Sequence, residues 1–400
     1  MRIDLAESGH VLEPRLGLRP VGARILVIVE DASLLLGEQL AALTAAKETG
    51  YDIQIAACTA SVEAESAMRG AGLALHRSPT GPGHAQPLEK LRAVVALDQL
   101  VRALTPDLLH CIGLRPVLYG GTVARLRRLP AVLAPPAINP VGETGQGFLG
   151  LRLLSFALGG ARTTIVVKAP EHRHSLVRAR VLDPRRATFL LRGAAADLTR
   201  FAPPKRTKSG FAPTVLVSPE GLDESAQCVV ARALQQIRDR GIAARFMLGP
   251  SGTGRSVPAL RIPPAVLEPD CGLRTPAEAL AQADLFCLAG ETGEGIPHSL
   301  VEAAASGRAL IAPDRRGCRE VVRPGSTGWL FTPGDAAGLA LALERSLLDT
   351  GFRHSAGTRA RELAQAEFSQ ESFLTAALTI YRAGLIAAPH DKRAPLEKMT

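Results

Sequence analysis

The chain of 400 residues alternates short apolar runs with longer segments in which apolar positions recur at helical spacing. The run at 24–29 predicts a buried strand, and it is followed by a predicted helix at 37–47 and a second strand at 53–57. Three further strand-like runs, separated by helix-length segments, lie at 108–110, 131–133 and 164–167. Such alternation is typical of βαβ units and predicts a parallel sheet covered by helices.

The second half of the chain repeats this alternation. Its predicted elements are, in order, a strand at 214–217, a helix near 226–240, strands at 244–248 and 284–288, a helix at 299–306 and a strand at 309–312. The tail at 336–385 is helical in pattern, with breaks predicted near Gly351 and Gly357. Two α/β halves therefore follow one another.

A segment rich in Pro, Lys and Ser at 201–210 separates the two halves and has the composition of an interdomain linker. A chain of this length also exceeds what one ordinary core accommodates. The predicted organisation is a leader at 1–22, a first domain at 23–200, a linker at 201–213, a second domain at 214–370, and at 371–400 a C-terminal helix, able to pack back on the first domain, with its tail.

The charge balance narrows the classes of partner. With 47 Lys and Arg against 38 Asp and Glu, the net charge is +9, which favours nucleotides, other polyanions or an anionic lipid surface. Basic groups lie at 125–128 and 178–186, but no basic stripe with interleaved aromatic residues is found, so we expect no nucleic-acid partner.

The N-terminal residues and the cysteines bear on the location of the protein in the cell. The first residues, MRIDLAESGH, do not resemble a signal peptide, and no run of 18 apolar residues occurs. The six cysteines match no zinc or redox spacing and are interpreted as reduced packing residues. We expect a cytoplasmic protein that at most contacts the inner face of the cell membrane peripherally.

The strongest chemical signal is the stretch GEGIPHSLVEAAASG at 293–307, which sets Glu294 and Glu302 eight residues apart. A buried strand precedes it, so Glu294 is predicted on the loop at the strand's carboxyl end and Glu302 about one turn inside the next helix. Both carboxylates are then able to face one cavity. Carboxylates accept hydrogen bonds from hydroxyl groups, and neighbouring backbone amides donate them, which suits a polyol ligand.

The residues around the two glutamates support this interpretation. Gly293 and Gly295 let backbone amides approach a ligand closely. Pro297 and Ser299 suit the start of a helix, where proline fits the first turn and serine caps unpaired N–H groups. The alternative is that Glu302 merely decorates a solvated helix face.

Other candidates are weaker. His110 ends a predicted strand, where doubly wound folds gather their ligands, but a structural role is the somewhat favoured interpretation. The segment 249–256 is one residue from a P-loop, with Arg255 at the lysine position. Prolines follow it where a P-loop needs a helix, so a surface turn is favoured.

The chain resembles the retaining GT-B glycosyltransferases of glycosyltransferase family 4, whose E-x7-E element matches Glu294 and Glu302. Segments in the family's order and spacing extend the resemblance, and they lie at 307–314, 317–322 and 325–335, with weaker matches at 107–110, 116–121 and 193–201. The resemblance covers roughly residues 24 to 385 and is most specific in the second half.

This resemblance implies a fold and an activity. The fold is GT-B, with two Rossmann-like doubly wound domains facing across a cleft. The implied reaction moves a hexose from a nucleoside diphosphate to a lipid-linked or polysaccharide acceptor, with retention of configuration and without a bound metal or other cofactor. By analogy Glu294 contacts the donor sugar and Glu302 the ribose, and amides near Gly295 and Ile296 line the sugar pocket. The catalytic candidates are Glu294 and His110.

The chain departs from the family at the phosphate-binding loop. The family usually carries an Arg and a Lys after the first strand of the second domain, whereas 218–225 reads SPEGLDES. Losing two charge-assisted contacts of about 1.5 to 3 kcal/mol each is a substantial loss of anion binding. Candidate replacements for the missing cations are Arg255, Arg315, Arg316 and Arg319. Gly37, in an acceptor-side loop without paired glycines, is a candidate phosphate or acceptor contact.

Two alternatives to the enzyme follow from this departure. The first is a catalytically impaired GT-B protein that acts as a binding or scaffold partner in polysaccharide assembly. The second is a GT-B sugar epimerase, which would need catalytic carboxylates in both domains.

Overall fold

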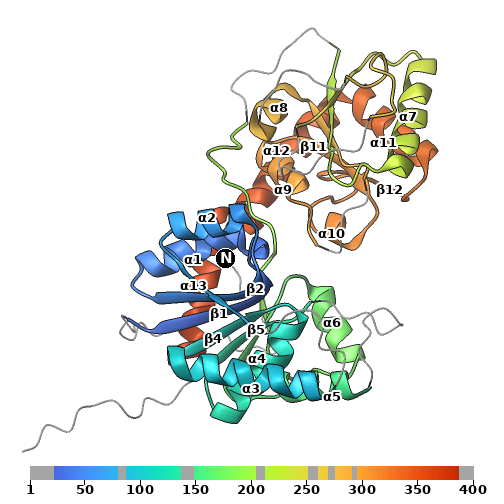
Figure 1. Cartoon of the computed structure of the whole chain (residues 1–400). Helices are drawn as coiled ribbons and strands as arrows, with labels where there is room; N and C mark the ends of the chain where they lie inside the picture. Colours follow the sequence, from blue (N-terminus) through green and yellow to red (C-terminus); the bar gives the residue numbers. More distant parts are fainter. Residues whose placement is uncertain are drawn as a thin grey trace, which may run out of the picture. The chain divides into compact units, whose positions relative to one another are not determined.

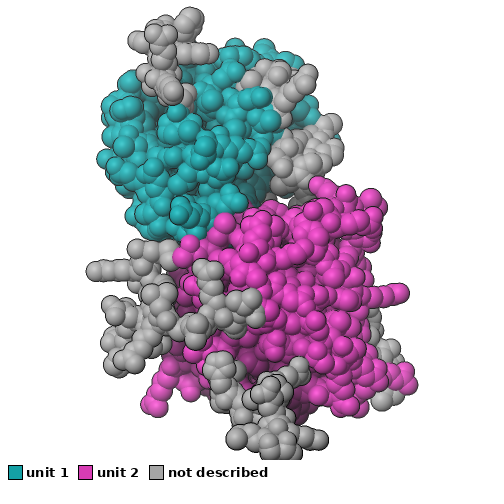
Figure 2. Space-filling view, turned by 90° about the vertical axis from the view of Figure 1, so that its left-hand side faces the viewer, with its two compact units in different colours: residues 1, 192–373 teal, residues 2–191, 374–400 magenta. Residues whose placement is uncertain are grey.

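The computed structural model describes residues 22–79, 87–136, 148–203, 212–250, 260–268, 275–290 and 295–386. These residues fall into two compact units, shown in different colours in Figure 2. Unit 1 comprises 192–373, and unit 2 comprises the preceding residues together with 374–386, apart from the gaps just given. Among the described helices, none combines the length and apolarity needed to cross a bilayer.

Unit 2 is built on a seven-stranded sheet in the order β3-β2-β1-β4-β5-β6-β7, and all its strand pairs are parallel. The strands are β1 Arg24–Asp31, β2 Asp52–Thr59, β3 Ala74–Arg77, β4 Leu108–Ile112, β5 Ala131–Ala134, β6 Thr163–Val167 and β7 Phe189–Leu190. The helices are η1 Ala32–Leu35, α1 Glu38–Glu48, α2 Val62–Gly70, α3 Pro87–Leu104, α4 Leu114–Arg127, α5 Phe148–Leu158 and α6 Pro170–Arg178.

Unit 1 has a five-stranded parallel sheet in the order β12-β11-β10-β8-β9. Its strands are β8 Thr214–Val217, β9 Arg245–Leu248, β10 Leu285–Cys287, β11 Ala309–Pro313 and β12 Gly328–Phe331. Its helices are α7 Glu224–Asp239, α8 Pro276–Gln282, α9 His298–Ala305, α10 Arg316–Arg319, α11 Ala336–Leu348 and α12 Thr350–Glu367, and α13 Gln370–Ile386 leads from unit 1 into unit 2.

Alternate strand residues point to opposite sides of a sheet, and in these parallel sheets both sides are apolar. Helices therefore cover each sheet on both faces. In unit 2 one core lies under α3, α4, α5 and α6, and the other lies under α1, α2 and α13 (Figure 1). In unit 1 one core includes α8, α9 and α12, and the other includes α7 and α11. The fold class predicted from the sequence, two Rossmann-like α/β domains, is confirmed.

Two local predictions differ from the structure. His110 is the third residue of the five-residue strand β4, so it lies inside the strand and not at its end. The predicted break near Gly357 is wrong, because α12 runs through this position. A Cβ at Gly357 would lie 2.2 Å from the Gly307 carbonyl oxygen, so glycine is needed there for close packing and not for a turn.

The cysteine prediction holds for the buried thiols. Among the described cysteines no disulfide forms, and Cys111, Cys287 and Cys318 are buried while Cys228 is exposed. Cys271 lies outside the described residues.

Candidate nucleotide-sugar site

The sheet order of unit 1 locates a crevice for a ligand. The chain leaves β8 towards β9 on one side and later continues with β10 on the other side, so the order reverses between β8 and β10. In open parallel sheets ligands bind at such a switch point, outside the carboxyl ends of the strands. The loops after β8 and β10 and the start of α9 therefore form the candidate site.

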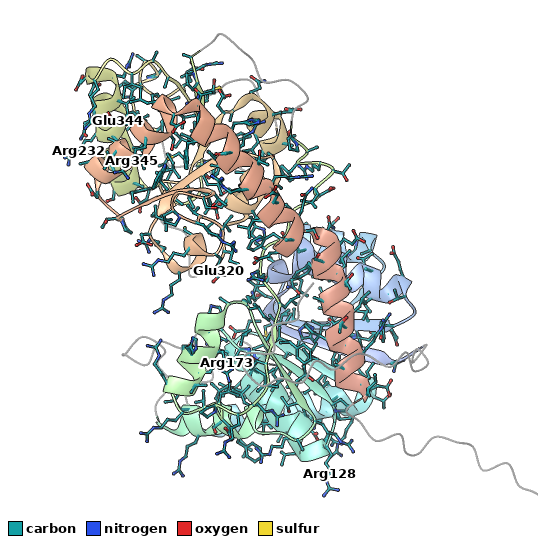
Figure 3. All side chains as sticks on the ribbon, turned by 180° about the vertical axis from the view of Figure 1, so that it is seen from behind. Arg128, Arg173, Arg232, Glu320, Glu344 and Arg345 are labelled. Atoms are coloured by element: carbon teal, nitrogen blue, oxygen red, sulfur yellow. The ribbon has the colours of Figure 1, made fainter. Side chains whose placement is uncertain are left out.

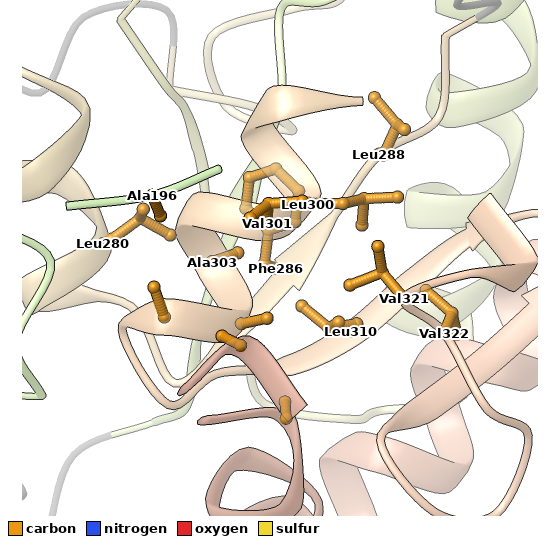
Figure 4. Packing of buried hydrophobic residues seen from close by; sticks show 14 of the residues in the cluster. Ala196, Leu280, Phe286, Leu288, Leu300, Val301, Ala303, Leu310, Val321 and Val322 are labelled. Carbon is orange, nitrogen blue, oxygen red and sulfur yellow. The ribbon is translucent and has the colours of Figure 1, made fainter. Parts of the chain in front are cut away.

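Helix α9 presents a polar edge beside a buried face. Figure 4 shows its apolar residues Leu300, Val301 and Ala303 packed against the core. His298, Ser299 and Glu302 are the less buried positions, and spacings of three and four residues place them along one side of the helix. Glu302 lies about one turn inside α9, at the place that the sequence predicted.

The start of α9 differs from the expectation in one detail. The helix begins at His298 with Pro297 as its N-cap residue, and no side chain caps it. Ser299 is already in the first turn, and its hydroxyl donates to the Glu220 carboxylate instead of capping the helix. Glu220 therefore joins the loop after β8 to the first turn of α9.

The three carboxylates of the loop after β8 have separate tasks. Asp223 is the N-cap of α7 and accepts a hydrogen bond of 2.8 Å from the Ala226 amide. Glu224 forms an exposed ion pair of 2.6 Å with Arg261. Of the three, Glu220 is the carboxylate that contacts α9, so one negative charge reaches the candidate site by this route.

Backbone contacts hold the walls of the crevice together. A Cβ at Gly290, just after β10, would lie 2.2 Å from the carbonyl carbon of Gly221, so the two loops touch through their backbones. A Cβ at Gly317 in α10 would lie 2.0 Å from the Gly295 carbonyl oxygen. Glycine is required at both positions, because real Cβ contacts do not become this short.

Arginines and a buried thiol stand beside α9. Arg319 pairs with Asp314 through two contacts of 2.5 and 3.0 Å, so its charge is already balanced. Burial raises the pKa of the Cys318 thiol to about 12; the charge of Arg315 opposes this rise, and the charges of Glu220 and Asp314 add to it. Arg315, Glu220 and Cys318 therefore share one neighbourhood at the carboxyl edge of the sheet.

Unit 2 has an equivalent switch point between β1 and β4, where its strand order reverses. Helix α4 follows Gly113, whose φ is +101° and which provides no side-chain cap. The Glu30 carboxylate, at the end of β1, accepts a hydrogen bond of 3.2 Å from the Arg115 amide in the first turn of α4. Glu30 thus takes over the capping of α4.

His110 lies deep in unit 2. It is 7% exposed, and its Nδ1 lies 2.9 Å from the hydroxyl oxygen of Tyr381 in α13. Burial lowers the pKa of His110 to about 4, so the ring is neutral at physiological pH. The contact gives His110 a structural role in holding α13 against β4, and its catalytic role stays a prediction.

The remaining candidates fall in two groups. Gly293, Glu294 and Arg255 lie outside the described residues, so their roles stay predictions. Gly295 and Pro297 precede α9, Ile296 is buried in the core beside it, and Gly37 precedes α1 with φ of +77°. Among the described residues no cluster of three or more potential metal ligands is present.

Sequence reasoning missed the structural use of two glutamates. Glu30 is the last but one residue of the first strand of unit 2, and Glu220 follows the first strand of unit 1. Both lie near the carboxyl end of a first strand, and a search for acidic residues at such ends would have found them.

Two family models match the chain. The model described as "Glycosyl transferase 4-like domain" matches residues 36–193, and "Glycosyl transferases group 1" matches residues 273–363. The second match includes α9 and the loops after β10 and β11. The candidate crevice of unit 1 thus lies largely within a segment that a glycosyltransferase model describes.

Similar curated proteins match in part. A protein named as the colanic acid biosynthesis glycosyltransferase WcaL of Escherichia coli K12 is 33% identical over 190 residues, covering 44% of this chain and 46% of its own length. N-acetyl-alpha-D-glucosaminyl L-malate synthase of Bacillus anthracis is 36% identical over 105 residues, covering 26% of this chain and 27% of its own length. The chain thus matches less than half the length of these curated relatives.

Solved structures match over most of the chain. A glycosyltransferase of Rickettsia africae has a TM-score of 0.67 at 14% identity and covers 91% of this chain and 99% of its own. HepE of Anabaena, in complex with UDP-glucose, has a TM-score of 0.65 at 15% identity and covers 90% of this chain and 99% of its own. The chain therefore carries a glycosyl transferase 4-like domain followed by a glycosyl transferases group 1 domain, on two Rossmann-like units of the GT-B fold.

Proposed function

We propose that this protein is a retaining glycosyltransferase of polysaccharide biosynthesis, which moves a hexose from a nucleoside diphosphate to a lipid-linked or polysaccharide acceptor. The observation that carries the proposal is the polar edge of α9, with Ser299 and Glu302, at the switch point of unit 1 inside the group 1 match. The similarity to WcaL supports the polysaccharide setting, and the similarity to HepE with UDP-glucose supports the class of donor.

The proposed roles follow the chemistry of a sugar nucleotide. Glu302 binds the ribose hydroxyls, and Glu294 contacts the donor sugar. Carboxylates suit both tasks because they accept hydrogen bonds from neighbouring hydroxyl groups. The amides of Gly295 and Ile296 line the sugar pocket. The reaction is proposed to need no bound metal, so chelation by EDTA is expected to leave turnover unchanged.

A turnover assay with UDP-, GDP- and ADP-sugars tests the donor site. We expect Glu302→Ala to lower kcat/KM at least about tenfold, since a charged hydrogen bond contributes about 1.5 to 3 kcal/mol. Glu362→Ala is the matched control, because Glu362 is an exposed glutamate on α12. NMR of the product anomer tests retention.

The outcomes separate the enzyme from its alternative. Equal turnover by Glu302→Ala and Glu362→Ala would contradict the proposed binding of the ribose by Glu302. A wild-type protein that neither turns over these donors nor binds any nucleoside diphosphate would instead be a GT-B scaffold protein.

We also propose a peripheral contact with an anionic membrane, through a patch formed by α4 and α5. Leu126 and Phe156 are exposed here by 68% and 38%, and the Arg125 guanidinium lies 4.1 Å from the centre of the Phe156 ring. Arg128 stands at the surface of unit 2 (Figure 3). Between Asp107 and Glu171 the sequence has seven Lys and Arg residues against one acidic residue.

Vesicle sedimentation tests this contact. Each basic residue near an anionic bilayer adds about 1 kcal/mol, so Arg128→Gln is expected to weaken binding to phosphatidylglycerol-containing vesicles about fivefold. Arg232→Gln is the control, since Arg232 is an exposed arginine on α7 of unit 1 (Figure 3). Equal binding of the two variants, or equal binding to neutral phosphatidylcholine vesicles, contradicts the proposed patch.

A further inference from the structure

The proposed donor site needs a positive charge for the leaving diphosphate, and the loop after β8 does not provide one. Transferred phosphoryl and diphosphate groups are stabilised by fixed cations and amide dipoles. Among the described residues at the carboxyl edge of unit 1, arginines directly follow β11. They are Arg315, Arg316 and Arg319. The structure distinguishes these three by what each one contacts.

Two of the three arginines are unsuited to the task. Arg319 holds Asp314 with both ends of its guanidinium, at 2.5 and 3.0 Å, so an anion would have to compete with a carboxylate already in place. Arg316 is the first residue of α10 and is exposed to solvent. A charge surrounded by water is screened and adds little to the binding of an anion in a crevice.

Arg315 is placed differently. It is half-buried and precedes α10 in an extended conformation, with φ of −122° and ψ of 158°. Helix α10 lies directly on the segment that leads into α9, because Gly317 leaves no room for a Cβ against the Gly295 backbone. Arg315 is therefore two residues from a backbone contact with the start of α9.

Glu220 reaches the first turn of α9 from the loop after β8. The charges of Glu220 and Arg315 act on the buried thiol of Cys318, which lies three residues after Arg315. The carboxylate of Glu220 accepts from the Ser299 hydroxyl in the first turn of α9. The unpaired N–H groups at the start of a helix attract anions. At the start of α9 the anion is the carboxylate of Glu220.

We propose that Arg315 is the cation that binds the donor diphosphate in this chain, and that Glu220 holds the first turn of α9 while no donor is bound. The inference rests on the proposed function and specifies its phosphate site. A diphosphate bound by Arg315 comes close to the first turn of α9, where the Glu220 carboxylate lies. The Glu220 carboxylate then opposes the incoming anion, since like charges a few ångströms apart repel.

Calorimetric titration of the full chain with UDP and GDP tests the inference. Arg315→Gln is expected to weaken the binding of whichever diphosphate the wild type binds by about 10- to 100-fold. Arg316→Gln, which removes the neighbouring exposed charge, is expected to stay within about twofold of the wild type. Glu220→Gln is expected to tighten binding about fivefold, a gain that misfolding cannot produce.

The titrations distinguish a failure of the proposed function from a failure of the inference about Arg315. If no nucleoside diphosphate binds to the wild type, the proposed function fails and the inference fails with it. If a diphosphate binds but Arg315→Gln and Arg316→Gln have equal affinities, or Glu220→Gln binds more weakly than the wild type, only the inference is overturned. Circular dichroism of each variant checks the fold, and Arg315→Lys, which keeps the charge, is expected to recover most of the affinity lost in Arg315→Gln.

Discussion

The two units place a glutamate at the same point of their topology but use it differently. In each unit the first strand lies beside the strand where the order reverses. A glutamate near the carboxyl end of that first strand reaches the first turn of the helix on the other side of the switch point. In unit 2, Glu30 accepts from a backbone amide of α4. In unit 1, Glu220 accepts from the hydroxyl of Ser299 in α9.

The difference concerns which groups are left available for a ligand. A carboxylate on a backbone N–H caps the helix, and its removal leaves that donor without its partner. A carboxylate on a serine hydroxyl leaves the helix amides where they are, and the hydroxyl can rotate to another acceptor. Unit 2 therefore has a closed helix start at its switch point, whereas unit 1 has one that an anion can take over.

The largest expected effect tests how rigid the crevice of unit 1 is. Gly290→Ala places a Cβ 2.2 Å from the Gly221 backbone, so the loop after β8 must move. We expect a loss of about 3 kcal/mol in the free energy of unfolding, measured with urea. Gly295→Ala is the control, since a Cβ there meets nothing within 4 Å. Equal stabilities of the two variants would show that the crevice walls adapt easily.

The next effect belongs to unit 2 and depends on pH. The pKa of His110 is about 4 in the folded protein and about 6.5 in the unfolded chain, so the unfolded chain binds the extra proton between these values. The contribution of His110 to stability is full above about pH 6.5 and is lost as the pH falls towards 4. Between pH 7 and pH 5 the loss amounts to about 2 kcal/mol.

The matched variant for this prediction is His110→Gln, which does not titrate. Urea unfolding at pH 7 and pH 5 is expected to show a smaller pH-dependent loss of stability in His110→Gln than in the wild type. The same loss in both proteins would assign the acid sensitivity to other groups, and it would weaken the structural role given to the contact with Tyr381.

The smallest expected effect compares the two glutamates directly. Glu30→Gln loses the charge that caps α4 and is expected to lower the free energy of unfolding by about 1 kcal/mol. Glu220→Gln is expected to change it by less than about 0.5 kcal/mol. Diphosphate binding is expected to respond in the opposite way, with a gain in Glu220→Gln and no change in Glu30→Gln. A larger destabilisation by Glu220→Gln than by Glu30→Gln would reverse the comparison.

Much of the fold and part of the site were predictable from local patterns. The strand at 214–217 lies where its apolar run predicted, and Glu302 lies one turn inside α9, because both depend on neighbours in the sequence. The contact between Glu220 and Ser299 joins residues 79 positions apart, so no local pattern contains it. The break predicted at Gly357 was wrong for the same reason. Gly357 lies inside α12, and the backbone that requires a glycine there is that of Gly307, between α9 and β11.

Local sequence patterns were sufficient to predict the two α/β halves, the position of Glu302 and the lack of cations in the loop after β8. These follow from periodicity, helix signals and residue type, which are properties of short segments. Three features required the folded chain: Asp223 caps a helix, Glu220 reaches α9, and Arg315 lies two residues from the contact of Gly317 with the Gly295 backbone. The physical reason is that the carboxyl ends of parallel strands meet at one edge of a sheet, so packing alone chooses which distant charges become neighbours.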